Sequence, residues 1–247
     1  MSHQTLVERF RGARSDPSLA LLEGFHPIKH AIRFGAELME VVCLNVAELA
    51  RLTANHAPDI AGALDGQVTE VSADVFEELA PLAPPTGVIA IARRPTVSLT
   101  ELLNNPALSP VVLLERPRNL GNIGAAVRVA AAAGAAGVLT IGTQDPWHPA
   151  ALIGGAGLQF ALPVTRTAAL PVCDRPLVVI DPGGDPLPEC SIPARAILAF
   201  GAERAGLSSQ LMATAERRVS IPMSAGVSSL NLATAVAVVL YSGRFGQ

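Results

Sequence analysis

Three short segments of the chain combine residue types that can bind an anion or stabilise a developing charge. The first is residues 115–128, E-R-P-R-N-L-G-N-I-G-A-A-V-R, where an apolar stretch leads through a Gly/Asn turn into an Ala-rich helix. Free amide groups at a helix N-terminus attract anions, so this turn is a candidate phosphate site. Arg128 is the only charged residue between Arg118 and Asp145, and a buried guanidinium needs a partner. The partner is either a carboxylate of the chain or a ligand phosphate, and the neighbouring helix start favours the phosphate.

The second segment is residues 199–207, A-F-G-A-E-R-A-G-L, in which a predicted strand ends at Gly201. A glycine at that point lets the backbone approach a ligand closely. Glu203 and Arg204 then lie in the loop before a helix. An ordinary capped turn explains this segment equally well.

The third segment is residues 219–231, V-S-I-P-M-S-A-G-V-S-S-L-N, which leads from a strand through a loop of small residues into a helix. Ser228 or Ser229 is the predicted N-cap of that helix. Asn231 lies in the first turn of an otherwise apolar helix, where it either supports the cap or belongs to a site. Taken alone, it fits the cap better.

In this order the three segments resemble the motifs of the SpoU (TrmH) branch of the SPOUT RNA methyltransferases. Those motifs read approximately Asn-x-Gly-x-x-x-Arg, then Gly-x-Glu-x-x-Gly-Leu, then Ile-Pro-Met followed by Ser-Leu-Asn. They correspond here to residues 122–128, 201–207, and 221–223 with 229–231. The resemblance covers the chain from about Pro110 to its C-terminus.

A second, weaker resemblance involves the N-terminal part. Residues 22–28, L-E-G-F-H-P-I, and 87–90, G-V-I-A, are similar to the small ribosomal-protein-like substrate-binding domain of the same family. Together the two resemblances imply an α/β protein: a C-terminal parallel-sheet SPOUT domain with a trefoil knot, and a smaller N-terminal α/β domain.

Membership would imply that S-adenosylmethionine binds in the knot and that a methyl group passes to a ribose 2′-oxygen of RNA. It would also imply a homodimer. The loops at Gly201, Ile221 and Leu230 would hold the cofactor through backbone groups. The catalytic residues would be a central arginine and four polar neighbours: Arg128, Asn122, Glu203, Ser229 and Asn231.

The resemblance leaves the role of Arg128 and the choice of RNA open. A guanidinium stays protonated at almost any pH, so orienting a phosphate and stabilising oxyanion charge suits Arg128 better than removing a proton. By analogy, a separate N-terminal domain favours ribosomal RNA over transfer RNA.

Charge gives mixed support for an RNA partner. The net charge is −3, whereas nucleic-acid binders are usually basic. The first 109 residues hold 8 basic and 13 acidic side chains, and the remainder holds 10 and 8. In addition, Gly155 stands where many relatives carry a serine close to a basic residue. Both features weaken the expected affinity for RNA.

The elements that must position these residues divide the chain into four parts. We predict an N-terminal extension (1–16), a small α/β substrate-binding domain (17–94), a linker (95–109) and the methyltransferase domain (110–247). Predicted helices cover residues 27–37, 46–55, 73–79, 121–133, 207–215 and 230–241. Predicted strands cover residues 39–44, 67–71, 87–92, 111–114, 137–141, 177–180, 196–200 and 218–221.

Composition argues against several other classes of protein. Half of the residues are hydrophobic, which excludes intrinsic disorder. The N-terminus is too charged for a signal peptide, and the apolar run near the C-terminus is about half of the roughly 20 residues that a spanning helix needs. We therefore expect a cytoplasmic protein without membrane contact. The three cysteines, in no CxxC pattern, are expected to be buried and unpaired, and no metal site is expected, although His26 and His30 are four residues apart.

Two alternatives come from other functional classes. A dinucleotide-dependent oxidoreductase would explain the Gly-Asn-Ile-Gly turn, but the glycines are not spaced G-x-G-x-x-G and no acidic residue ends the next strand. The other is a non-catalytic RNA-binding or scaffold protein that keeps the fold. Intact Asn122, Arg128, Glu203 and Asn231 argue against it.

Overall fold

The computed structural model describes residues 3–202 and 205–242 of the chain. The chain forms two compact units. Unit 1 takes the chain as far as Thr96 together with Trp147–Ala161, and unit 2 takes the intervening residues and those after Ala161. The chain therefore passes between the units three times, and the segment Trp147–Ala161, assigned from sequence to the C-terminal part, packs in unit 1.

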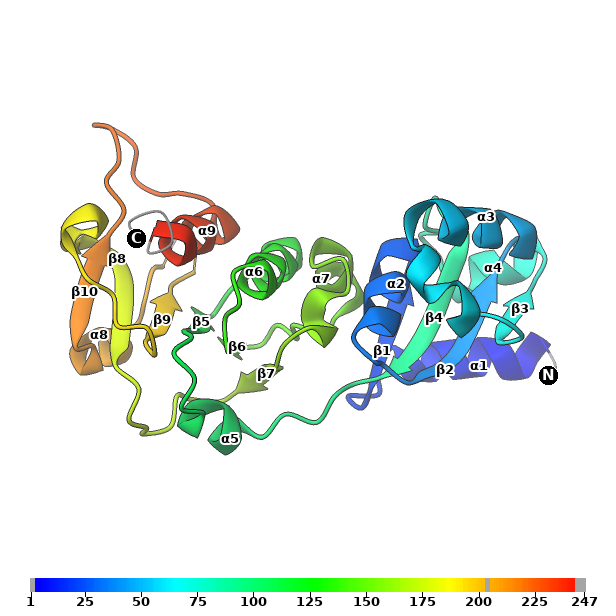
Figure 1. The fold of residues 1–247 in the computed structure, drawn as a ribbon, viewed down its shortest axis with the longest axis horizontal. Coiled ribbons are helices and arrows are strands. Elements are labelled where there is room, and N and C mark those ends of the chain that lie inside the picture. Colours follow the sequence, from blue (N-terminus) through cyan, green and yellow to red (C-terminus); the bar gives the residue numbers. More distant parts are fainter. Residues whose placement is uncertain (1–2, 203–204, 243–247) are drawn as a thin grey trace. The chain divides into compact units, whose positions relative to one another are not determined.

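Unit 1 is a four-stranded sheet with helices on both faces (Figure 1). Its strand order is β1-β4-β2-β3, and β4 runs antiparallel to both of its neighbours. The strands are β1 (Leu19–Glu23), β2 (Leu38–Cys43), β3 (Val68–Glu70) and β4 (Val88–Arg93). The helices are α1 (His3–Ala13), α2 (Phe25–Arg33), α3 (Val46–His56), the 3-10 turn η1 (Pro58–Ala63) and α4 (Ala73–Leu79).

The core of unit 1 uses both sides of β4, which is buried from Val88 to Ala92. Ile89 and Ile91 point to one face, where they share a cluster with side chains of α1 and α4. Leu6, Val7 and Phe10 of α1 belong to that cluster. The residues expected to form an N-terminal extension thus supply part of the core.

Residues Trp147–Ala161, which we call the strap, hold α7 (Pro149–Gly154) and the 3-10 turn η2 (Leu158–Phe160). The strap packs on α2 and β1. His30 Nδ1 and the Ala156 carbonyl oxygen are 2.6 Å apart, and burial lowers the pKa of His30. A Cβ on Gly157, at φ +76°, would lie 2.5 Å from the Pro27 oxygen, so only glycine permits this approach.

Gly155 also lies inside the strap, where it is buried. A Cβ there would be 2.5 Å from Oε1 of the buried Gln159. The position at which relatives carry a serine is therefore a packing position in this chain. The absence of a serine there reflects packing of the strap.

Unit 2 is a six-stranded parallel sheet in the order β10-β8-β9-β5-β6-β7 (Figure 1). The predicted parallel α/β class is confirmed. Its strands are β5 (Val111–Glu115), β6 (Gly137–Ile141), β7 (Val164–Thr167), β8 (Leu177–Pro186), β9 (Ile197–Phe200) and β10 (Arg217–Ser220). Its helices are α5 (Leu99–Asn104), α6 (Leu120–Ala132), the 3-10 turn η3 (Leu187–Glu189), α8 (Ser209–Thr214) and α9 (Leu232–Ser242).

Helices cover both faces of this sheet, with α6 packed beside α9 and with α5 and α8 on the opposite face (Figure 1). Every residue of β5 is buried, as its unbroken apolar run predicts for a central parallel strand. Leu113 faces the side chains of α5 and α8. Its neighbours Val112 and Leu114 point to the other face.

The sequence patterns did not predict three helices (α1, α5 and α7), two strands (β1 and β7) or the 3-10 turns η1, η2 and η3. Helix α5 lies within the predicted linker, where Ser98 caps it by accepting a hydrogen bond from the Glu101 amide. The cysteines are free as expected, but only Cys43 is buried, and Cys173 and Cys190 are half-buried. Among the described residues, no cluster of His, Cys, Asp or Glu could hold a metal, and no helix is long and apolar enough to span a membrane.

Arg175 joins the linker to unit 2. Its side chain is 3% exposed and donates hydrogen bonds to five backbone carbonyl oxygens, those of Leu102, Leu103, Asn105, Ser109 and Arg195. One guanidinium thus supplies the donors for five carbonyls, of which those of Leu102 and Leu103 are bonded in buried surroundings. This explains how a segment rich in Pro and Asn is fixed.

Replacing Arg175 with methionine tests this role. We expect R175M to lower the free energy of unfolding by about 2–4 kcal/mol, because several buried carbonyls lose their donor together. Urea denaturation followed by circular dichroism measures it. The matched variant R166M removes an exposed guanidinium that bonds one carbonyl, that of Thr143, and should cost less than about 0.5 kcal/mol. Equal losses would contradict this role.

Candidate active site

A cavity of about 250 Å³ opens at the carboxyl ends of β9 and β10, beside residues 180–182 of β8. This is where open α/β sheets bind their ligands. Its walls come from these parts of the three strands, the two loops that follow β9 and β10, and the first turn of α9. The lining residues are Ile180, Asp181, Pro182, Phe200, Gly201, Ala202, Gly206, Leu207, Ile221, Met223, Ser228, Ser229, Leu230, Leu232 and Ala235.

The loop after β9 forms the floor by folding back on itself. Ala202 and Gly206 make an isolated antiparallel bridge, and the Gly206 amide donates to the Ala202 carbonyl at 2.9 Å. A Cβ on Gly201 would lie 2.2 Å from the Gly206 carbonyl carbon, which no side chain tolerates. Gly201 thus lets the loop pack at backbone contact with Gly206, and the predicted approach of Gly201 to a ligand stays a prediction. Glu203 lies outside the described residues.

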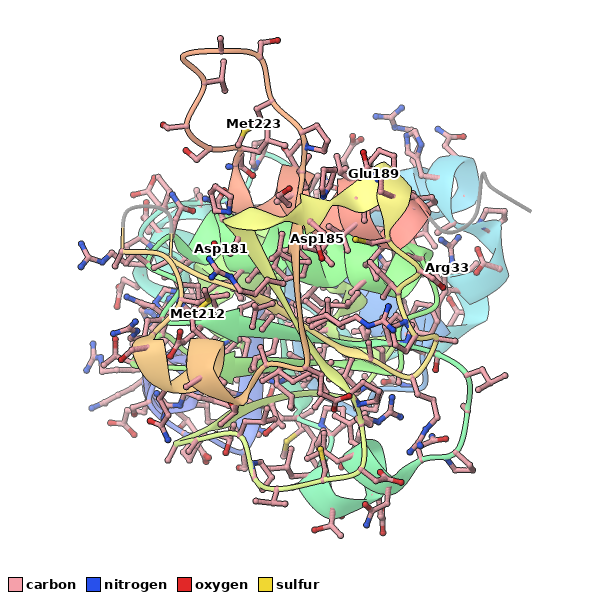
Figure 2. The ribbon with its side chains drawn as sticks, turned by 90° about the vertical axis from the view of Figure 1, so that its left-hand side faces the viewer. Arg33, Asp181, Asp185, Glu189, Met212 and Met223 are labelled. Atoms are coloured by element: carbon pink, nitrogen blue, oxygen red, sulfur yellow. The ribbon has the colours of Figure 1, made fainter. Side chains whose placement is uncertain are left out.

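The loop after β10 supplies a second group of lining residues. Ile221, Ser229 and Leu230, three of the residues predicted for the site, line the cavity. Leu230 is 37% exposed, and Met223 lies further along the same loop (Figure 2). This loop and the Gly201 loop both supply lining residues, most of which are apolar.

Asn231 and Asn122 bring the first and third segments together. Asn231 Nδ2 donates to Asn122 Oδ1 at 2.9 Å. Asn231 Oδ1 accepts from the amides of Ala233 and Thr234 at 2.9 and 3.4 Å, so Asn231 caps α9 and the prediction of a Ser228 or Ser229 cap is wrong. One amide side chain therefore fixes the start of α9 and links it to the first turn of α6.

Glu115 ties the first segment to the second. This carboxylate is 6% exposed, and its Oε2 accepts a hydrogen bond from the Ser208 amide at 2.6 Å. Ser208 is itself the N-cap of α8. Arg116 Nη2 lies 3.8 Å from the same oxygen, so the charge of Glu115 is partly balanced. The end of β5 is thereby fixed to the end of the loop that starts at Gly201.

Arg128 is exposed on α6 and is not among the residues that line the cavity. Six residues at about 100° each place it about 120° around the helix from Asn122. Within residues 3–202 and 205–242 no hydrogen bond or ion pair reaches it. The expectation that its guanidinium is buried in the helix is therefore wrong, because the Ala-rich helix turns this side chain to solvent. The alternative in which a carboxylate of the chain holds it is not seen among these residues.

Asp181 is a site residue that the sequence reading missed. Its Oδ1 accepts from Arg218 Nη2 and from the Gly183 amide. Burial acts to raise the pKa of Asp181, but these hydrogen bonds outweigh burial and lower it. It is the one ionisable side chain among the described residues that line the cavity. Its place immediately after the predicted strand 177–180 was the available signal.

The sequence is similar to those of known proteins. A model of the SpoU rRNA Methylase family matches residues 109–241. The chain is 30% identical, over 96% of its length and 90% of the relative, to the 23S rRNA (adenosine(1067)-2′-O)-methyltransferase of Streptomyces laurentii. It is 28% identical, over 94% of its length and 84% of the relative, to the 23S rRNA (uridine(2479)-2′-O)-methyltransferase of Streptomyces viridochromogenes.

The fold is shared with a solved structure of similar length. The SpoU methyltransferase AviRb from Streptomyces viridochromogenes, crystallised in complex with the cofactor AdoMet, superimposes with a TM-score of 0.78. The match covers 98% of this chain and 99% of AviRb at 24% identity. This likeness confirms the predicted fold class. The threading of the trefoil knot stays a prediction.

Removing the side chain of Asn231 tests its double role. We expect N231A to lower the free energy of unfolding by about 1–2 kcal/mol, because the α9 cap and the bond to Asn122 are both lost. N231D keeps the cap acceptor and loses only the donor to Asn122, so about half of that loss is expected. Thermal and urea unfolding measure both variants. An N231A protein as stable as the wild type would contradict the capping role.

Proposed function

The chain belongs to the SpoU rRNA methylase family, and we propose that it transfers a methyl group from S-adenosylmethionine to a ribose 2′-hydroxyl of ribosomal RNA. The observation that carries the proposal is that the second and third motif segments line one cavity at the end of a parallel sheet, and that the Asn231–Asn122 hydrogen bond joins the first segment to the third. Ribosomal RNA is supported by the relatives, both of which are named for 2′-O-methylation of 23S rRNA.

The residues of the cavity fit S-adenosylmethionine. Gly201 lines the cavity and lets its loop pack on the Gly206 backbone, and Phe200, Ile221 and Leu230 give apolar surface for a purine ring. We assign Gly201, Ile221 and Leu230 to cofactor binding. When bound, the cofactor supplies an electrophilic methyl group on a positively charged sulfur.

Arg128 is suited to the RNA substrate. A ribose hydroxyl is a weak nucleophile that gains negative charge as its proton leaves, and a guanidinium that stays protonated stabilises such charge. Exposure of Arg128, with no partner among the described residues, leaves its five donors available for an RNA phosphate. We therefore assign Arg128 to phosphate orientation and oxyanion stabilisation.

The polar residues around the cavity position the reacting groups. The Asn231–Asn122 hydrogen bond fixes α6, the helix that carries Arg128, relative to the loop that lines the cavity. Ser229 lies on that loop, and Glu203 belongs to the motif that follows Gly201. We assign supporting roles in catalysis to these four residues, since correct orientation accounts for much of an enzyme's rate enhancement.

Family membership supports two further proposals. The protein acts as a homodimer, and it works in the cytoplasm, which the bacterial origin of relatives such as that of Streptomyces laurentii supports. The non-catalytic alternative is kept as an outcome of the second experiment below, because cofactor binding without methyl transfer identifies it.

Calorimetric titration with S-adenosylmethionine tests the cofactor site. We expect the wild type to bind and L230W to lose at least tenfold in affinity, because a larger ring crowds a residue that lines the cavity. L108W is the matched control, since Leu108 is 80% exposed and lies outside the lining. Failure of a folded wild type to bind would contradict the proposed function, and equal binding by L230W would contradict the assignment of Leu230.

Methyl transfer to ribosomal RNA tests the role of Arg128. We expect R128A to slow incorporation of tritiated methyl groups at least about a hundredfold, as for loss of one oxyanion donor, with unchanged affinity for the cofactor. R166A removes another exposed arginine of unit 2 and should keep its rate. Wild-type activity in R128A would refute the assignment. A wild type that binds the cofactor but methylates no RNA would identify the non-catalytic alternative.

A further inference from the structure

Asp181 lies on an irregularity of β8 that directs it at the cavity. The parallel register between β10 and β8 shifts between Arg218, paired with Val179, and Val219, paired with Asp185. The residues of β8 between these pairs bulge out of the ladder. Asp181 and Asp185 thus follow one another along one strand (Figure 2), but only Asp181 lines the cavity.

Two glycines make the bulge possible. A Cβ on Gly184 would lie 2.5 Å from the Arg218 carbonyl carbon, and a Cβ on Gly183 would lie 2.8 Å from Arg218 Nη2. The close approach lets the guanidinium of Arg218 reach Asp181 Oδ1, to which the Gly183 amide also donates at 2.9 Å. The carboxylate is therefore held in one orientation.

The second oxygen of this carboxylate is free to accept a ligand donor. Both hydrogen bonds end on Oδ1, and Oδ2 accepts none from the residues that the structure describes. The side chain is 24% exposed, and the rest of the described lining is apolar, serine or backbone. An oriented acceptor at the edge of an apolar cavity selects a ligand that carries a donor there.

The charge balance favours a neutral donor. Arg218 already pairs with the carboxylate, so a second cation, such as an ammonium group, would meet the positive guanidinium close by. A vicinal diol suits the site better, since its two hydroxyls can donate to one carboxylate. A carboxylate at a strand end takes the same role toward ribose in dinucleotide sites.

On the basis of the proposed function, we propose that Asp181 Oδ2 binds the ribose hydroxyls of the cofactor and so makes the cavity select a ribonucleoside. Arg218 is a positioning residue for that carboxylate. Both residues lie outside the three motif segments in which the other cofactor residues were found.

Calorimetry with S-adenosylhomocysteine and its 2′-deoxy and 3′-deoxy forms tests the assignment. We expect D181N to bind S-adenosylhomocysteine about tenfold to a hundredfold more weakly than the wild type, as for loss of a charged acceptor. The wild type should bind at least one deoxy form correspondingly more weakly. For that form D181N should add little further loss, because the hydroxyl that Asp181 binds is already missing.

D185N is the matched control, since it removes the same charge from an exposed position of the same strand and should bind like the wild type. R218Q keeps the carboxylate of Asp181 but removes the guanidinium that orients it. We therefore expect a smaller loss of affinity for R218Q than for D181N. Thermal unfolding checks that each variant is folded.

The outcomes separate the proposals. A folded wild type that binds no S-adenosylhomocysteine refutes the proposed function, and the role of Asp181 with it. Wild-type binding with equal affinity in D181N refutes Asp181 alone. An equal D181N loss for the ribose and deoxy forms means that Asp181 only shapes the wall or binds another group, and also refutes it. If D181N does not fold, the wild type alone tests the proposal. Equal affinity of the wild type for all three ligands then overturns it.

Discussion

The carboxyl ends of β9 and β10 and residues 180–182 of β8 meet at one end of the parallel sheet, and each wall of the cavity follows from that meeting. Because neighbouring strands are parallel, each connection must run back from the carboxyl end of one strand to the start of the next. Strand segments about 20 residues apart in the sequence therefore reach the same end of the sheet. Phe200 ends β9, Ile221 directly follows β10, and Ile180 is the last residue of β8 that pairs with β9. The loops beyond them need only fold inward to enclose a ligand, and Gly201 lets one of them do so at backbone contact.

Long-range polar contacts then make a single site of these loops. The Asn231–Asn122 hydrogen bond joins α9 to α6, and the buried Glu115 joins the end of β5 to the cap of α8. Each contact spans about a hundred residues of sequence and fixes an element that carries a motif. The site is therefore preorganised by buried or capping polar groups, while the residue assigned to RNA, Arg128, stays at the surface of α6.

The sequence predicted most of what local pattern determines. The helix 73–79 and the strand 137–141 were placed to the residue, since an apolar period bounded by turn residues defines both. Sequence patterns did not predict the features that tertiary contacts determine. Arg175 orders a Pro- and Asn-rich segment through five carbonyls, which no local pattern reveals. The position of Asp181 at the cavity depends on a register shift between two strands. The α9 cap is Asn231 because its side chain accepts from the Ala233 amide.

The strap means that the smaller unit is encoded by two separate stretches of the gene. Its cover over α2 and β1 is encoded about fifty residues downstream of the last strand of that unit, inside the coding sequence of the larger one. A gene segment that ended at Thr96 would specify the sheet without that cover. Exchange of this unit between relatives by recombination would therefore have to transfer two separate stretches of DNA. Such an arrangement favours the joint inheritance of both units.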